Sequence, residues 1–166
     1  MDRHVLSVFV RNQYGVLARI SSMFRRRGFN IDSLTVGETE NPEYSRMTVT
    51  FNGDDVVKNQ IVRQLAKMPD VECLTELEKA ESVSRELVLV KIKNSKESRQ
   101  DIMSVVDIFR AKVVDYGTEA MIIEITGESS KIDAFIDLVE EFGIIEVCRT
   151  GIVALKRGNG SILNEN

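Results

Sequence analysis

The apolar residues of this chain change from strand-like to helix-like spacing in the same order twice, once on each side of the polar stretch 78–84. Within residues 15–27 they recur along one helical face, whereas residues 47–51 alternate between apolar and polar, as in a half-buried strand. Each half reads as strand, helix, strand, strand, helix, strand. The sequence therefore predicts an α+β chain of two tandem ferredoxin-like βαββαβ domains, each with a four-stranded antiparallel sheet and two helices on one face.

The expected elements follow from these periods. In the first half we expect strands over 4–10, 31–36, 47–51 and 71–77, and helices over 15–27 and 57–68. In the second half we expect strands over 87–93, 113–116, 120–126 and 144–155, and helices over 102–109 and 132–139. Asp54 or Asp55 is expected to cap the second helix. Ser129 or Ser130 is expected to cap the fourth, with Asp133 in a position like that of a capping box.

The polar stretch is the natural boundary between the domains. We expect a first domain at 1–77, a linker at 78–84, a second domain at 85–158 and a loose tail at 159–166. The first domain has equal numbers of acidic and basic side chains, which is compatible with a zwitterionic ligand. The edge strands and the uncovered sheet faces of such small domains favour pairing with a second copy, so we expect a homodimer.

Charge and composition exclude several classes of partner. The net charge of −4 disfavours nucleic acid and anionic membranes, both of which need a basic surface. No apolar run is long enough for a membrane span, and no secretory leader is expected. The only two cysteines, Cys73 and Cys148, have no metal-site spacing and are expected in strand cores. We therefore expect a reduced, cytoplasmic protein.

A catalytic site is also disfavoured by composition. The only histidine, His4, is expected to be an ordinary exposed residue, and the chain has no phosphate-binding glycine motif. We therefore predict no catalytic residues, no metal site and no cofactor bound by this chain.

The most informative segment joins the first strand to the first helix. Gly15 allows a sharp turn, and the amides of Gly15, Val16 and Leu17 would be free at a helix N-terminus that favours a carboxylate. Asn30 begins the second strand and is expected to lie near Asn12. An apolar wall would come from Val16, Leu17 and Ile31. These residues suit a small apolar amino acid, although a glycine and an asparagine before a helix are also common loop chemistry.

Several ordered stretches resemble one known family. They include Arg26–Gly37, Ser45–Thr48, Arg85–Leu87, Lys131–Phe135 and Arg149–Leu155. The first half resembles an ACT domain, a small-molecule-sensing module, and the chain from about residue 3 to 158 resembles the small regulatory subunits of acetolactate synthase. Two departures from the family pattern are Tyr14, where Pro or Ser is common, and Ala111, where Gly is common.

The resemblance implies a function without an active site in this chain. In that family a large catalytic subunit binds thiamine diphosphate, Mg²⁺ and FAD, and condenses pyruvate with pyruvate or 2-oxobutyrate on the route to valine, leucine and isoleucine. The small subunit activates it and confers feedback inhibition, usually by valine, with leucine or isoleucine as possible competitors.

The resemblance also implies particular residues. Valine would bind between the ACT domains of a dimer at positions that fall here on Asn12, Gly15, Val16, Leu17, Asn30 and Ile31. The second domain would activate the large subunit, with Phe109 and Arg110 as candidate contacts.

Three other functions stay open on the sequence alone. The first is a free-standing ACT-type amino-acid-binding module that regulates a different enzyme. The second is a small enzyme on the same fold. A DNA-binding regulator fits least well, because the chain is acidic and shows no helix-turn-helix segment.

Overall fold

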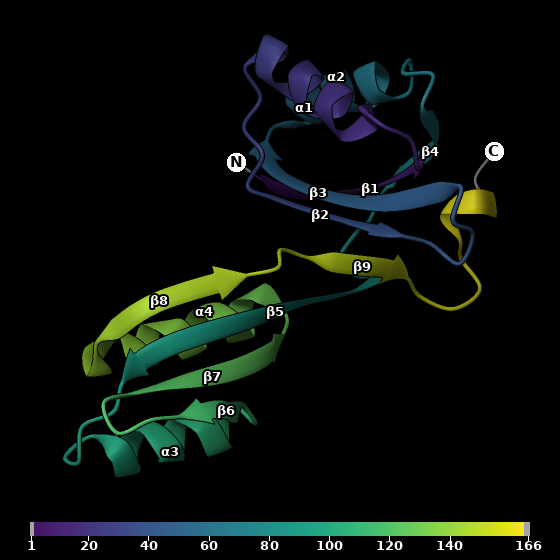
Figure 1. The fold of residues 1–166 in the computed structure, drawn as a ribbon. Helices are drawn as coiled ribbons and strands as arrows, with labels where there is room; N and C mark the ends of the chain where they lie inside the picture. Colours follow the sequence, from purple (N-terminus) through teal and green to yellow (C-terminus); the bar gives the residue numbers. More distant parts are fainter. Residues whose placement is uncertain (1, 165–166) are drawn as a thin grey trace. The chain divides into compact units, whose positions relative to one another are not determined.

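A computed structural model describes residues 2–164, and the chain forms two compact units (Figure 1). The first unit contains the residues up to Ser84 together with those from Ile152 onward, and the second contains Arg85–Gly151. Each unit is described by itself.

The first unit has a four-stranded antiparallel sheet of order β2-β3-β1-β4. Its elements are β1 (Asp2–Arg11), α1 (Val16–Arg27), β2 (Ser33–Glu38), β3 (Tyr44–Gly53), α2 (Asp55–Leu65) and β4 (Val71–Glu76). Both helices cover the same face of the sheet (Figure 1). Strand β2 is therefore one edge of this sheet and β4 is the other.

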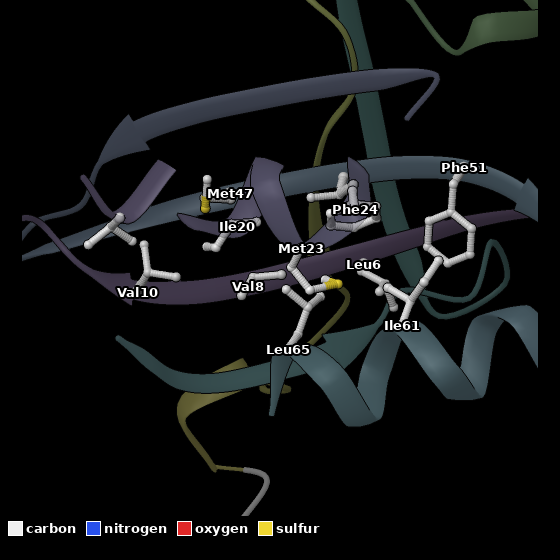
Figure 2. Packing of buried hydrophobic residues seen from close by; sticks show 12 residues of the cluster. Leu6, Val8, Val10, Ile20, Met23, Phe24, Met47, Phe51, Ile61 and Leu65 are labelled. Atoms are coloured by element: carbon white, nitrogen blue, oxygen red, sulfur yellow. The ribbon is translucent and has the colours of Figure 1, made fainter. Parts of the chain in front are cut away.

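The core of the first unit lies between that face and the two helices. Alternation along β1 turns Leu6 and Val8 toward the helices, where they pack with Ile20 and Phe24 of α1 and Ile61 of α2 (Figure 2). All five side chains are at most 1% exposed. Burial of each such side chain contributes about 1.5–3 kcal/mol, so this cluster fixes α1 on the sheet.

The second unit repeats this arrangement. Its elements are β5 (Ser82–Lys93), α3 (Arg99–Ile108), β6 (Lys112–Tyr116), β7 (Ala120–Gly127), α4 (Ser129–Val139), the 3-10 helix η1 (Glu140–Phe142) and β8 (Ile144–Arg149). The strands pair antiparallel in the order β6-β7-β5-β8. The predicted α+β class of two ferredoxin-like βαββαβ folds is thus confirmed.

The second sheet has a fifth strand, which differs from the prediction of four. The region 144–155, expected to form one strand, is interrupted by Gly151 with a φ of 84°. Beyond it, β9 (Val153–Lys156) pairs with β5. Ile152 and Ala154 pack against Leu77 and Val5, so residues after Gly151 belong to the first unit.

The structure therefore divides the chain differently from the predicted boundaries. Residues 152–158 group with the first unit instead of the second, because their apolar side chains are buried there. Ser82 to Ser84, expected in the linker 78–84, are the first residues of β5 and group with the first unit, whereas the rest of that strand belongs to the second. Within the predicted tail 159–166, Ile162 of the 3-10 helix η2 (Ile162–Asn164) is only 4% exposed. Residues 165–166 lie outside the described residues.

One of the two predicted helix caps is present. Oδ1 of Asp54 accepts a hydrogen bond from the amide of Val57 at 2.8 Å, which caps α2. The prediction for α4 was wrong, because Ser129 and Ser130 lie inside the helix and Glu128 takes the cap position without a side-chain bond. Asp133, expected in a capping box, instead accepts from Arg149.

Two expectations about burial were also wrong. His4 is 7% exposed rather than open to solvent, because its Nδ1 donates to Oε1 of Glu76 at 2.8 Å and its ring packs on Phe51. Cys148, expected in a core, is exposed because it lies on the sheet face turned away from the helices. Cys73 is half-buried.

Candidate functional site

The loop between β1 and α1 is held at the end of the first sheet by Asn12. Its backbone amide donates to the carbonyl of Glu43 at 2.7 Å, and its Nδ2 donates to the carbonyl of Pro42 at 2.9 Å. Nδ2 also lies 3.4 Å from Oε2 of Glu38, the last residue of β2. Through these bonds Asn12 holds the β2–β3 turn against the end of β1, an arrangement called the clamp below, while its side chain stays exposed.

The second unit contains the same clamp 82 positions later, at Asn94. Its amide donates to Glu119 at 2.8 Å, and its Nδ2 donates to Gly117 at 2.6 Å. There the side-chain oxygen accepts from Nε of Arg99 at 3.0 Å. Among the described residues no donor is hydrogen-bonded to the corresponding oxygen of Asn12. Within the described residues the side-chain oxygen of Asn12 is thus a free acceptor, whereas that of Asn94 is bonded to Arg99.

Helix α1 begins without a side-chain cap. Gly15 occupies the cap position with a φ of 81°, a left-handed conformation that favours glycine, and the first turn carries no acidic residue. The amide of Val16 donates to the carbonyl of Gln13 at 3.4 Å, so the prediction that it is free was wrong. Within the described part of the chain, no acceptor is bonded to the amides of Gly15 and Leu17. These two amides and the helix dipole favour an anion there.

Arg19 lies beside this helix start, and the sequence analysis missed it. Its Nη1 is 3.1 Å from the point where a Cβ on Gly15 would lie. Its Nε donates to Oδ2 of Asp70 at 2.7 Å, and this hydrogen bond is the main cause that raises the pKa of the guanidinium above its ordinary value. A basic side chain one turn after the cap glycine was the available signal, because helical side chains lean toward the N-terminus.

The predicted apolar wall consists of one buried, one half-buried and one exposed residue. Val16 is 4% exposed and packs in the core. Leu17 is 45% exposed. Ile31 is half-buried against the same core. Tyr14, one of the departures from the family pattern, is fully exposed beside Gly15.

The structure does not bring Asn30 near Asn12 within one chain. Asn12 bonds to Glu43 of the β2–β3 turn, whereas Asn30 lies beside Asp32, whose amide donates to Thr50 near the other end of β3 at 2.8 Å. Seven residues separate these two partners, which is roughly 23 Å along a strand. The expectation of neighbouring chain ends was wrong, because β2 runs parallel to β1 and starts at the opposite end.

In the second unit the two candidate contact residues have different environments. Phe109 is half-buried with its ring edge on Phe135, 5.5 Å between centroids, so it belongs mainly to the core. Arg110 is exposed and has a φ of 53°, which is unusual for a residue other than glycine. It stands where Gly28 stands in the first unit, since both amides bond at 3.1 Å to the carbonyl three residues earlier.

The described residues contain neither a metal-binding cluster nor a membrane-spanning helix. No group of three or more His, Cys, Asp or Glu side chains is placed to hold a metal ion. No helix of residues 2–164 is long and apolar enough to span a membrane.

The antiparallel sheet with both helices on one face agrees with the ACT class, the class of regulatory domain that the family comparison identifies in the first half of the chain. Residues 6–72 match the family model described as the AHAS small subunit-like ACT domain, and residues 85–158 match that of the small subunit of acetolactate synthase. The chain belongs to the family of acetolactate synthase small subunits, which are regulatory, the catalytic activity residing in the large subunit.

Relatives from distant organisms are similar in sequence to this chain along nearly its whole length. The probable acetolactate synthase small subunit of Archaeoglobus fulgidus is 47% identical over 157 residues, covering 95% of this chain and 98% of the relative. The acetolactate synthase small subunit of Mycolicibacterium smegmatis is 46% identical, covering 93% and 91%. The crystal structure of the Thermotoga maritima small subunit superimposes with a TM-score of 0.88 at 41% identity, covering 96% of this chain and all of that one.

Proposed function

We propose that this chain activates the large subunit of acetolactate synthase and makes it sensitive to valine, which binds between the ACT domains of a homodimer. Family membership supports the regulatory role. The observation that carries the dimer site is the separation of Asn30 from Asn12, because no small amino acid reaches both within one chain.

Pairing through the edge strand β2 would complete the site. In an antiparallel pair of β2 strands from two copies, the start of one strand lies opposite the end of the other. Asn12 lies at the end of β2, beside Glu38, whereas Asn30 and Ile31 precede its start. A second copy would therefore supply Asn30 and Ile31 to the loop 12–17 of the first, and the twofold axis would generate two such sites.

The chemistry of the two halves suits a zwitterion with a short apolar side chain. The amides of Gly15 and Leu17 would receive the carboxylate, and the open side-chain oxygen of Asn12, with that of Asn30, would accept from the ammonium group. Leu17 and Ile31 would contact the side chain. Valine exceeds alanine by two carbons, worth about 1.6 kcal/mol or roughly fifteen-fold in affinity. Because selectivity on this scale is modest, leucine and isoleucine are expected to compete with valine.

The large subunit would carry the chemistry. Thiamine diphosphate, Mg²⁺ and FAD belong in this proposal to that partner, and this chain would bind none of them. Arg110 is the better of the two candidate contacts, since Phe109 is largely committed to its own core. The two free cysteines are compatible with assembly in the reducing cytoplasm.

Valine would act by linkage. It inhibits by this route only if the ACT dimer has a different affinity for valine when the large subunit is active. By reciprocity, the large subunit must then change the affinity for valine by the same factor.

The test is acetolactate formation from pyruvate with the cognate large subunit, alone and mixed with this chain, with and without valine. We expect the mixture alone to show the increase in rate and valine to reverse it. Asn30→Ala should weaken valine inhibition, whereas Asn59→Ala on the exposed surface of α2 should not. If the chain changes neither rate nor valine response, the proposal fails and a free-standing amino-acid-binding module becomes the better account.

A further inference from the structure

The guanidinium of Arg19 lies over the turn that starts α1. Its Nη1 comes within 3.1 Å of the point where a Cβ on Gly15 would lie, so a side chain at position 15 would press on the guanidinium. Nε is bonded to Asp70, and within residues 2–164 no acceptor is bonded to Nη1 or Nη2. The side chain is 49% exposed, so a small ligand can reach these nitrogens.

Asp70 holds that guanidinium in place. Its residue is 8% exposed, and its backbone carbonyl accepts from the amide of Arg11 at 2.9 Å, which ties it to the end of β1. Because the backbone of Asp70 is held by Arg11 and its carboxylate accepts from Nε of Arg19, the pairing restricts the rotamers of Arg19. The remaining edge of the guanidinium is left for a second carboxylate, since the group presents donors on more than one side.

We propose that Arg19 is a further effector-binding residue that recognises the carboxylate of the amino acid, and that Asp70 is its positioning residue. This inference rests on the proposed effector site at the loop 12–17. The amides of Gly15 and Leu17, the N-terminus of α1 and the guanidinium then act on the same carboxylate. A charge-assisted bond of this kind is stronger than bonds from neutral amides alone.

The proposal assigns a specific effect to Gly15→Asp. The new carboxylate would project from the Cβ position that already lies 3.1 Å from Nη1 of Arg19. It would pair with the guanidinium and take the place of the effector's carboxylate. The variant is then blocked by its own side chain, in addition to the strain of a φ of 81° at a residue with a Cβ.

The test compares valine with valinamide, which keeps the ammonium group and the side chain but carries no charged carboxylate. Calorimetry on the full chain would measure both affinities in the wild type and in the double variant Arg19→Met, Asp70→Asn. The second substitution avoids leaving a buried carboxylate without its partner. Arg63→Met, in the last turn of α2, is the matched control for loss of one arginine charge.

We expect the wild type to prefer valine over valinamide by at least about tenfold, the range of bonds to charged groups. The double variant should lose most of that preference while its affinity for valinamide stays within about twofold, an effect that a merely structural role would not produce. Arg63→Met should keep the preference. Arg19→Lys, which retains the charge without the planar fork, should recover part of it.

Two results would count against the inference and are distinguishable. If the double variant, folded by its melting temperature, keeps the wild-type preference for valine, Arg19 does not read the carboxylate although the effector site stands. If the wild type binds neither valine nor valinamide, the proposed function itself fails.

Discussion

A site shared between two copies makes a quantitative prediction for mixed dimers. Gly15→Asp disables the half of the site contributed by the loop 12–17, and Asn30→Ala disables the half contributed by the start of β2. Each variant alone forms homodimers in which both sites contain one defective half. In a dimer of one Gly15→Asp chain and one Asn30→Ala chain, one site receives both defects and the other receives none.

The magnitude follows from the geometry. The two halves lie roughly 23 Å apart in each chain, so an intact loop and an intact Asn30 must come from different copies. Random exchange at equal concentrations makes half of the dimers mixed, each with one intact site out of two. The mixture of the two variants, neither of which has an intact site when alone, should therefore recover about a quarter of the wild-type number of intact valine sites.

The assay is a count of valine sites by equilibrium dialysis after the chains have been unfolded and refolded together. Separately refolded and then combined variants give the baseline without exchange. A second mixture, of equal amounts of wild type and a chain that carries both substitutions, sharpens the result. In a mixed dimer of these two chains the double variant should disable both sites. That mixture should retain about a quarter of the sites, whereas sites contained in single chains would leave about half. Recovery of no sites in the first mixture, or half in the second, would refute the shared site.

Three further predictions concern stability and reactivity. Asp54→Ala should lower the free energy of unfolding by about 1 kcal/mol in a urea titration, since it removes the cap of α2. Arg110→Gly should raise it by up to about 1 kcal/mol, because the φ of 53° is strained for arginine. A thiol reagent near pH 8 should label exposed Cys148 before Cys73, because burial raises the pKa of the Cys73 thiol and keeps it protonated.

Each of these has an outcome that contradicts it. An unchanged urea midpoint for Asp54→Ala would mean that the first turn of α2 needs no side-chain acceptor. A loss of stability in Arg110→Gly would mean that contacts of the arginine side chain outweigh its backbone strain. Equal labelling rates of the two thiols, measured by mass spectrometry of peptides, would mean that Cys73 is as accessible as Cys148.

The fold could be predicted because local periodicity and core packing agree. The apolar face of α1 includes Ile20 and Phe24, and the same residues are buried against the sheet. The alternation at 47–51 likewise matches β3. Asp54 could be identified because an N-cap is a local event, whereas Ser129 could not be excluded without the position of Glu128.

The candidate site was only partly predictable, because the errors in its prediction concern contacts between residues that are distant in sequence. The residue types at 12–17 indicate a turn before a helix start, and Gly15 has the expected positive φ. The distance between Asn12 and Asn30 depends on the direction of β2, which the motif does not contain. Arg19 is read as a surface residue until its pairing with Asp70, 51 positions later, is known.

His4 and the residues after Gly151 show the same limit. A polar residue near a chain end is usually exposed, but Glu76 of the neighbouring strand β4 gives the buried His4 a hydrogen-bond partner. The stretch 144–155 is apolar on both sides of Gly151, whose positive φ marks the interruption. Its second part belongs to another core because of Leu77, which lies far away in sequence.

The assignment of β9 to the first unit makes the second unit an insertion within a discontinuous domain. The chain leaves the first unit after Ser84 and re-enters it at Ile152. Within the first unit the amide of Arg157 donates to the carbonyl of Glu81 at 2.8 Å. Within the second unit the amide of Thr150 donates to the carbonyl of Leu87 at 3.0 Å. Truncation of the chain at Ser84 would therefore remove Ile152 and Ala154, which pack against Leu77. An isolated sensor domain should instead be made by excising 85–151 and joining the two adjacent chain ends with a short hairpin turn.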